Sequence, residues 1–191
     1  MSDIRIGREG HVGVAELARP PHNYFDMSLI RLLAEAFEAF DADPAIRVVL
    51  LAAEGRNFCA GADFSNPARD TVGQRGGDSL YREAVRLFRC RKPVVAAVQG
   101  AAVGGGLGLA MVADFRVAAP ESRFTANFNR LGFHPGFGLS VTLPRAIGAQ
   151  KAAMLFYTGR RLTGTEAEAI PLHRLIQRTS GRMARIRGSR A

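Results

Sequence analysis

The chain of 191 residues is poor in the residue types that build several common kinds of site. Its two cysteines, Cys59 and Cys90, are too few for a disulfide framework and lack a metal-ligand spacing. The four histidines are scattered along the sequence, so we expect no zinc site. These scarcities favour a protein of the reducing cytoplasm that carries no metal.

Long apolar runs are also missing. No stretch reaches the roughly 18 apolar residues that a membrane span needs. The richest one, residues 94–113, is interrupted by Gln99 and by several glycines. The first residues are acidic and polar and lack the apolar region of a targeting sequence. We therefore expect no membrane partner.

Acidic residues end at Glu168, although the chain carries a formal net charge of +9. The arginines after that point have no acidic neighbours: Arg174, Arg178, Arg182, Arg185, Arg187 and Arg190. A basic tail of this kind can bind nucleic acid. It has no hydrophobic periodicity, however, so we interpret residues 171–191 as an aberrant, disordered tail and expect no nucleic-acid partner. Residues 1–170, with a globular composition, form the one expected domain.

Hydrophobic patterning predicts alternating strands and helices over residues 1–170. A hairpin is expected from strands at 4–8 and 11–17, and further strands at 47–53, 93–98 and 115–118. Helices are expected from an Asp26 cap to Phe40 and at 79–89, 106–113, 138–147 and 149–157. Thr163 and Glu166 fit a capping box for a helix that should fail to develop before Pro171. Residues 65–78 should form a mobile loop, and the order of elements indicates a layered α/β domain with parallel crossovers.

Two of the buried strands lead into loops of small residues, at 57–63 and 100–106. Small residues let a second backbone or a ligand approach closely, and glycine permits a positive φ. Two such loops could aim free backbone N–H groups at one point, which is what an oxyanion hole requires. Each loop alone could equally be a tight turn against the core. A dinucleotide site is disfavoured, because Leu109 stands where the third glycine of G-x-G-x-x-G belongs.

Taken together, these segments resemble a known family. "FCAGAD" at 58–63 and "KPVVAAVQGAAVGGGLGLAMVADFRVAA" at 92–119 are similar to the two signature segments of the crotonase superfamily, which contains the enoyl-CoA hydratases and isomerases. "PHNYFD" at 21–26 resembles its early asparagine motif, and residues 143–170 resemble its later helical region. The resemblance covers about residues 4–170. It implies a ClpP/crotonase ββα spiral core that binds an acyl-CoA thioester, with coenzyme A present only as part of the substrate and no further cofactor.

The resemblance also implies roles for individual residues. The backbone N–H groups of Ala60 and Gly105 would bind the thioester oxygen and stabilise an enolate. The expected lining of the acyl-CoA site comprises Arg19, Phe25, Ala62, Asp63, Gly104 and Phe128. Asp63 could instead brace its own loop. Asp114 is expected to be a buried acid that binds backbone amides.

The chain departs from the family at the positions where hydratases carry two glutamates. By their spacing from the glycine loop, these positions fall at Gly108 and Phe128, and neither residue can carry a proton. Ordinary hydration is therefore in doubt. His134 is the best substitute acid–base group, because histidine titrates near neutral pH, although it could also be a structural loop residue. Cys59 lacks an activating partner for nucleophilic catalysis.

The chain departs from the family a second time at the C-terminal end of the matching sequence. Family members continue with helices that cover the active site and build a homotrimer, whereas here the pattern fails at about Ile170. We expect a truncated or frameshifted C-terminal part, an exposed apolar patch and a doubtful trimer. Three hypotheses follow: a hydratase, isomerase or lyase acting on an acyl-CoA, an inactive acyl-CoA-binding remnant, or a nucleic-acid binder. The expected fold and loops favour the first.

Overall fold

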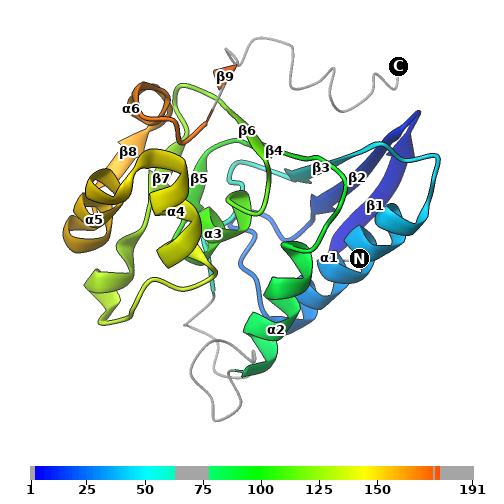
Figure 1. The fold of residues 1–191 in the computed structure, drawn as a ribbon, viewed down its shortest axis with the longest axis horizontal. Coiled ribbons are helices and arrows are strands. Elements are labelled where there is room, and N and C mark those ends of the chain that lie inside the picture. The colour runs from blue at the N-terminus through cyan, green and yellow to red at the C-terminus, as the bar shows by residue number, and fades with distance from the viewer. Residues whose placement is uncertain (1–2, 63–77, 174, 177–191) are drawn as a thin grey trace.

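The computed structural model describes residues 3–62, 78–173 and 175–176 (Figure 1). Its larger sheet has the strand order β1-β2-β3-β4-β6-β9. The strands are β1 (Ile4–Glu9), β2 (Val12–Leu17), β3 (Val48–Ala53), β4 (Val94–Val98), β6 (Phe115–Ala118) and β9 (Leu175–Ile176). β1 runs antiparallel to β2, and the following pairs are parallel. The predicted hairpin, the parallel crossovers and the layered α/β class are confirmed.

A second sheet of three short strands lies beside the first. It has the order β5-β7-β8, formed by β5 (Ala101–Val103), β7 (Arg123–Thr125) and β8 (Arg161–Thr163). β5 and β7 are parallel, and β8 is antiparallel to β7. The sequence patterns did not predict these strands, because each is only three residues long and pairs with segments far away in the chain. This small sheet carries the glycine-rich loop that follows β5.

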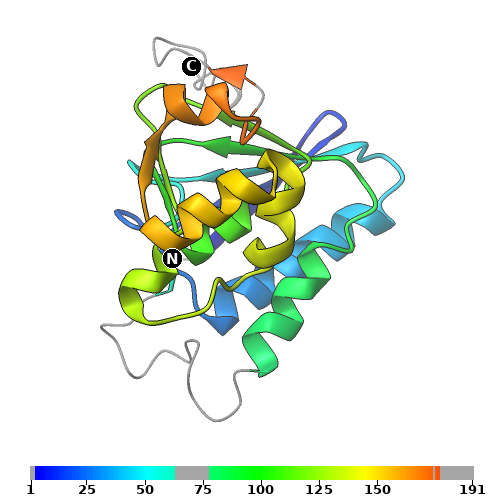
Figure 2. The ribbon, with the colours of Figure 1, turned by 60° about the vertical axis from the view of Figure 1, so that its left-hand side comes forward.

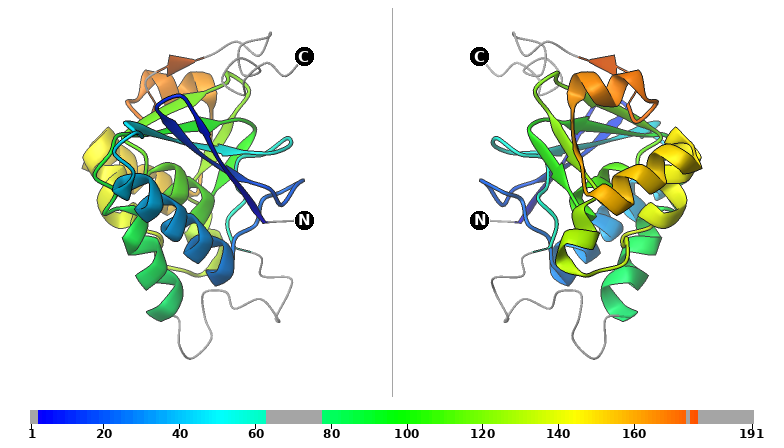
Figure 3. Two further views of the ribbon diagram at one scale, coloured as in Figure 1. Left: turned by 90° about the vertical axis from the view of Figure 1, so that its right-hand side faces the viewer. Right: turned by 90° about the vertical axis from the view of Figure 1, so that its left-hand side faces the viewer.

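Helices α1 (Met27–Ala42) and α2 (Asp78–Leu87) lie side by side on the same side of the large sheet (Figure 3). The Asp26 side chain caps α1 by accepting a hydrogen bond from the Leu29 amide at 2.9 Å, as predicted. The apolar stripe of α1 is buried and includes Ile30, Leu33 and Phe37. Burial of this stripe joins the helix to the main hydrophobic core.

The remaining helices gather around the second sheet. They are α3 (Gly105–Ala110), the 3-10 helix η1 (Asn127–Leu131), α4 (Leu139–Ile147), α5 (Ala149–Thr158) and α6 (Gly164–Ala169). Every residue of α3 is buried, and α4 and α5 lie in front of it in Figure 2. α3 therefore holds the end of the glycine-rich loop inside the protein.

Two expectations about the later chain need correction. α6 does form, because both hydrogen bonds of the Thr163–Glu166 capping box are present. Order also does not stop at residue 170. Leu172 and His173 are buried, and β9 adds to the large sheet. The buried Arg116 side chain donates to the Leu172 carbonyl at 2.6 Å and fixes this segment in place.

The expectation that Asp114 is a buried acid is only partly correct. Its carboxylate does accept a hydrogen bond from the Val94 amide at 2.8 Å. The residue is exposed, however, because it lies between the end of α3 and the start of β6.

Residue 174 and residues 177–191 lie outside the described part of the chain, so the expectation of a disordered basic tail is not addressed there. The same holds for the loop expected at 65–78, except that Asp78 begins α2. Within the described residues, no helix combines the length and the apolar character required to cross a membrane.

Candidate active site

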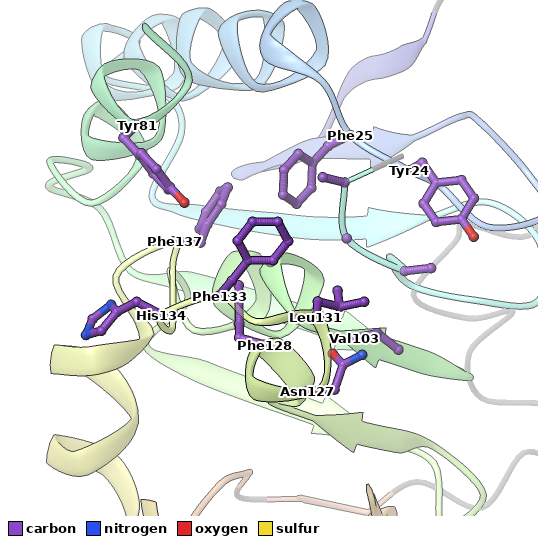
Figure 4. A pocket seen from close by; sticks show the side chains of 15 residues that line it. Tyr24, Phe25, Tyr81, Val103, Asn127, Phe128, Leu131, Phe133, His134 and Phe137 are labelled. Atoms are coloured by element: carbon purple, nitrogen blue, oxygen red, sulfur yellow. The ribbon is translucent and has the colours of Figure 1, made fainter. Parts of the chain in front are cut away.

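A pocket of about 500 Å³ opens where the two small-residue loops meet η1 and the start of α2 (Figure 4). Its lining is mainly apolar and aromatic. The lining residues are Tyr24, Phe25, Ala60, Gly61, Ala62, Tyr81, Val103, Gly104, Gly105, Asn127, Phe128, Leu131, Phe133, His134 and Phe137. An enclosed apolar cavity with a few polar groups is the usual form of a small-molecule site.

The two loops run parallel and are joined through their backbones. The Phe58 amide donates to Gln99 at 2.8 Å, the Cys59 amide to Ala101 at 3.0 Å, and the Val103 amide to Cys59 at 3.0 Å. These bonds form a parallel bridge between Cys59 and Ala102. Beyond Val103 the second loop turns into α3 at Gly105, and the first loop continues past it through Gly61 and Ala62.

The closeness of the loops explains their small residues. A Cβ atom on Gly106 would overlap the carbonyl oxygen of Cys59. A Cβ atom on Gly61, whose φ is +90°, would lie 2.9 Å from the Val103 oxygen and 3.5 Å from the Gly105 nitrogen. Only glycine permits this approach and this backbone conformation without strain. The first loop therefore passes directly beside the amide of Gly105.

Some backbone N–H groups at this junction donate a hydrogen bond to the protein, and others do not. The Ala60 amide donates to the His22 carbonyl at 2.9 Å, so, against expectation, it has no proton to offer a ligand. The amides of Ala62 and Gly105 form no hydrogen bond with any residue that the structure describes, and both residues line the pocket. Amides without a protein acceptor are available to a ligand or to water.

Asn23 and Asn57 hold this junction in place. Asn23 is fully buried at a φ of 49° and donates its side-chain amide to the carbonyls of Glu54 at 2.9 Å and Asn57 at 2.7 Å. The Asn57 side chain donates to Pro21 at 3.0 Å and accepts from the Ala101 amide at 3.2 Å. The two asparagines thus connect the early asparagine motif to both loops.

The positions where hydratases carry glutamates are filled by apolar packing. Gly108 is buried, and a Cβ atom there would lie 2.6 Å from the Cβ atom of Phe137. Phe137 is itself buried, and its ring centroid lies 5.2 Å from that of Phe25. Phe128 lines the pocket and faces its interior (Figure 4). Among the described lining residues, none is Asp, Glu, Lys or Arg.

Four other predicted residues lie as follows. Phe25 is buried beneath the second loop, where its ring occupies the space that a side chain on Gly105 would need. Gly104 lines the pocket, and a Cβ atom there would lie 3.8 Å from the Phe128 ring. His134 lines the pocket but is exposed. Asp63 lies outside the described residues.

Arg19 is not among the lining residues and is held by carboxylates instead. It pairs with Asp26 at 2.8 Å and with Asp3 at 2.5 Å. Burial disfavours the charged form of Asp26, but hydrogen bonds from the Leu29 amide, Ser28 and Arg19 outweigh this and lower the pKa of Asp26. Arg19 and Asp26 therefore brace the start of α1.

Cys59 is fully buried, and burial raises the pKa of its thiol to about 12. A nucleophilic role is therefore excluded at neutral pH. No group of three or more metal-binding side chains occurs among the described residues. Sequence reasoning missed several lining residues of the pocket, among them Tyr81 and Phe137. The run Gly136-Phe137-Gly138 carried a signal for the second, since a large ring between glycines is unusual in a loop.

Comparison with known proteins identifies the family. The family model described as enoyl-CoA hydratase/isomerase matches residues 7–175. A relative named "Probable enoyl-CoA hydratase" from Rhizobium meliloti is 40% identical over 167 residues, covering 86% of this chain and 65% of that protein. Another, "Probable enoyl-CoA hydratase EchA14" from Mycobacterium tuberculosis, is 41% identical over 133 residues, covering 65% of this chain and 50% of that protein.

Solved structures agree with this. The chain is similar to an enoyl-CoA hydratase from Bacillus anthracis, with a TM-score of 0.85, 32% identity and coverage of 93% of this chain and 70% of that one. The chain spans between half and two thirds of the length of the two curated relatives above. With the crotonase fold and the match over residues 7–175, the chain belongs to the enoyl-CoA hydratase/isomerase family.

Proposed function

We propose that this chain binds an acyl-CoA thioester and stabilises its enolate in an oxyanion hole formed by the amides of Ala62 and Gly105. The observation that carries the proposal is the close approach of the two loops at the pocket, where the amides of Ala62 and Gly105 both lack a described acceptor and Gly61, next to Ala62, lies beside the Gly105 nitrogen. Ala62 thereby takes the role expected of Ala60, whose amide is bound to His22.

Two convergent amides are sufficient for the chemistry of an enolate. Each donor in an oxyanion hole lowers the barrier by about 3–4 kcal/mol, because it is already oriented where negative charge develops. The surrounding pocket is apolar, which strengthens these hydrogen bonds. Since no charged side chain lies among its described lining residues, the acyl group that fits is apolar and uncharged.

The reaction is a transformation of the enolate other than ordinary water addition by two glutamates. Gly108 and Phe128 offer no proton, and Phe137 fills the space above Gly108. This same observation favours a second candidate, an acyl-CoA-binding protein without turnover. The two candidates share the binding step and differ in whether protons are exchanged at the α-carbon of the thioester.

Infrared spectroscopy of a bound thioester tests the oxyanion hole. Butanoyl-CoA labelled with ¹³C at the thioester carbonyl should show its C=O stretch at lower wavenumber when bound, because two N–H donors polarise the bond. Gly106→Ala, whose methyl group would push Cys59 and the first loop away, should abolish most of this shift. Gly7→Ala is the matched control, since nothing lies within 4 Å of its added methyl group. Binding without any shift in the unsubstituted protein would refute the proposed hole.

A further inference from the structure

Few side chains around the pocket can carry a proton. Among the described lining residues they are Tyr24, Tyr81 and His134, with the amide of Asn127 unable to act as an acid or base at ordinary pH. Any proton transfer to a bound thioester by the described lining side chains must pass through one of the three. The orientations and surroundings of these three side chains show which of them can present its proton-carrying group to the pocket.

His134 and Tyr24 are poorly placed for this role. The His134 side chain is exposed, and its ring points away from the phenyl rings of the pocket (Figure 4). The Tyr24 ring packs against His22, with centroids 5.2 Å apart, and its hydroxyl points away from the pocket centre (Figure 4). Both residues therefore border the pocket without presenting their titrating atoms to it.

Tyr81 is placed differently. It projects from the first turn of α2, next to the buried Leu80 and Ala84 that fix this helix against the core, and its hydroxyl points toward Phe137 (Figure 4). That hydroxyl forms no hydrogen bond with a described residue. It also lies against Gly136, where an added Cβ atom would be 2.5 Å from the hydroxyl oxygen. A half-buried hydroxyl without a protein partner is free to bond to a ligand.

Resting on the proposed oxyanion hole, we infer that Tyr81 is the catalytic residue that carries protons to and from the α-carbon of the bound acyl thioester. In the forward step the Tyr81 phenolate takes the α-proton, the C–H bond breaks, and its electron pair moves into the enolate whose oxygen is held by Ala62 and Gly105. In the reverse step the neutral hydroxyl returns a proton to that carbon. Tyr81 exchanges its own proton with water between the steps, so no other reactant is consumed.

This role has a pH signature. Burial raises the pKa of Tyr81, so its phenolate is a minor form at neutral pH and a stronger base than an exposed tyrosine. Proton removal should therefore accelerate by about tenfold for each pH unit between neutral pH and about pH 9. Hydroxide removes the proton with the same dependence, so the signature of Tyr81 is the part of the rise that remains after subtraction of the exchange without protein and that disappears in Tyr81→Phe.

The experiment measures α-proton exchange in D₂O. Phenylacetyl-CoA, whose acyl group is apolar, is incubated with the protein. Deuterium at its α-carbon is followed by mass spectrometry, and the Kd of the thioester is measured by calorimetry. Tyr81→Phe should lower the exchange rate about 100-fold or more and leave the Kd within about twofold. Tyr157→Phe, at a tyrosine with 81% exposure on α5, is the matched control and should exchange like the unsubstituted protein.

A second variant distinguishes a specific loss of α-proton exchange from a general loss of structure. Gly136→Ala keeps the phenol but displaces its hydroxyl, so exchange should fall while the melting temperature stays close to that of the parent. If Tyr81→Phe exchanges at the parental rate, or if the parent binds phenylacetyl-CoA without any exchange, the role of Tyr81 is overturned and the oxyanion hole stands. If the parent binds no thioester, the proposed function fails and the role of Tyr81 fails with it.

Discussion

Phe137 occupies the place above Gly108, where a Cβ atom would lie 2.6 Å from the Phe137 Cβ atom and 2.8 Å from its carbonyl oxygen. Phe137 holds this position with a positive φ of 52°, which is unusual for a bulky residue. The loss of a glutamate at position 108 is thus matched by a ring that fills the vacated volume. The two positions should behave as a coupled pair.

Gly108→Glu alone should therefore destabilise the fold and restore no hydration. We expect a loss of about 3 kcal/mol or more, because the new side chain overlaps Phe137 and its charge is buried. In Gly108→Glu/Phe137→Gly, the space is reopened and the positive φ is relieved. Urea unfolding of both single variants and the double variant should give a favourable coupling energy of about 1–3 kcal/mol. Strict additivity would show that Phe137 does not block position 108.

His134→Ala should have little effect. The side chain is exposed at the edge of the pocket, so the free energy of unfolding should change by less than about 0.5 kcal/mol. Phenylacetyl-CoA affinity and α-proton exchange should stay within about twofold of the parent. A tenfold fall in exchange at unchanged affinity would instead assign acid–base work to His134.

Asn23→Ala should weaken both the fold and the site. It removes two hydrogen bonds from the buried Asn23 side chain to the carbonyls of Glu54 and Asn57 and one from the Arg19 amide, and we expect a cost of about 3 kcal/mol. Asn23→Gly separates the backbone contribution, since glycine accepts the positive φ. Asn129→Ala is the control, because that exposed residue makes a single side-chain bond, to Tyr157. Unfolding measurements in urea rank the three variants.

Asp26→Asn should reduce stability in a pH-dependent way. The folded pKa of Asp26 lies below that of an unfolded aspartate, about 3.9, so its charge stabilises the fold above that pH, and this contribution is lost as the pH falls through the lowered folded value. At neutral pH the variant should be about 2 kcal/mol less stable, and the difference should shrink below about pH 4. Urea unfolding across this range checks the sign. A difference that grows in acid would contradict it.

Cys59 should resist thiol reagents in the native protein. Its side chain is fully buried and its pKa is about 12, so thiolate is scarce and inaccessible at neutral pH. Burial also raises the pKa of Cys90, to about 11. Maleimide labelling followed by mass spectrometry should therefore be slow until denaturant is added. Rapid native labelling at Cys59 would show that the two loops separate readily.

Much of the fold follows from local patterns in the sequence. The stripe of Ile30, Leu33 and Phe37 predicts α1, and its Asp26 cap is where the spacing places it. The three-residue strands were not predictable in this way, because β5 exists only through its pairing with β7, some 20 residues further on. β9 likewise depends on the distant strand β6.

Both loops at the pocket were predicted from the sequence, but which amide of the first loop lacks a protein acceptor was not. Spacing alone cannot tell whether Ala60 or Ala62 is free, since the answer depends on the His22 carbonyl, which belongs to a different segment. Tyr81 and Phe137 were missed for a related reason. Both enter the pocket from elements whose return to it is set by packing of α2 on α1 and by the turn before α4.

The Cys59–Ala102 bridge has a consequence for how this site can change over time. Ala62 lies in the pocket three residues beyond this bridge, and its backbone amide depends on no particular side-chain functional group. Exchange of neighbouring side chains can redirect the chemistry while the anchor stays. Insertion or deletion of one residue between Cys59 and Ala62 would bring a different backbone amide to the pocket, so length variation in this segment should be far more damaging than substitution.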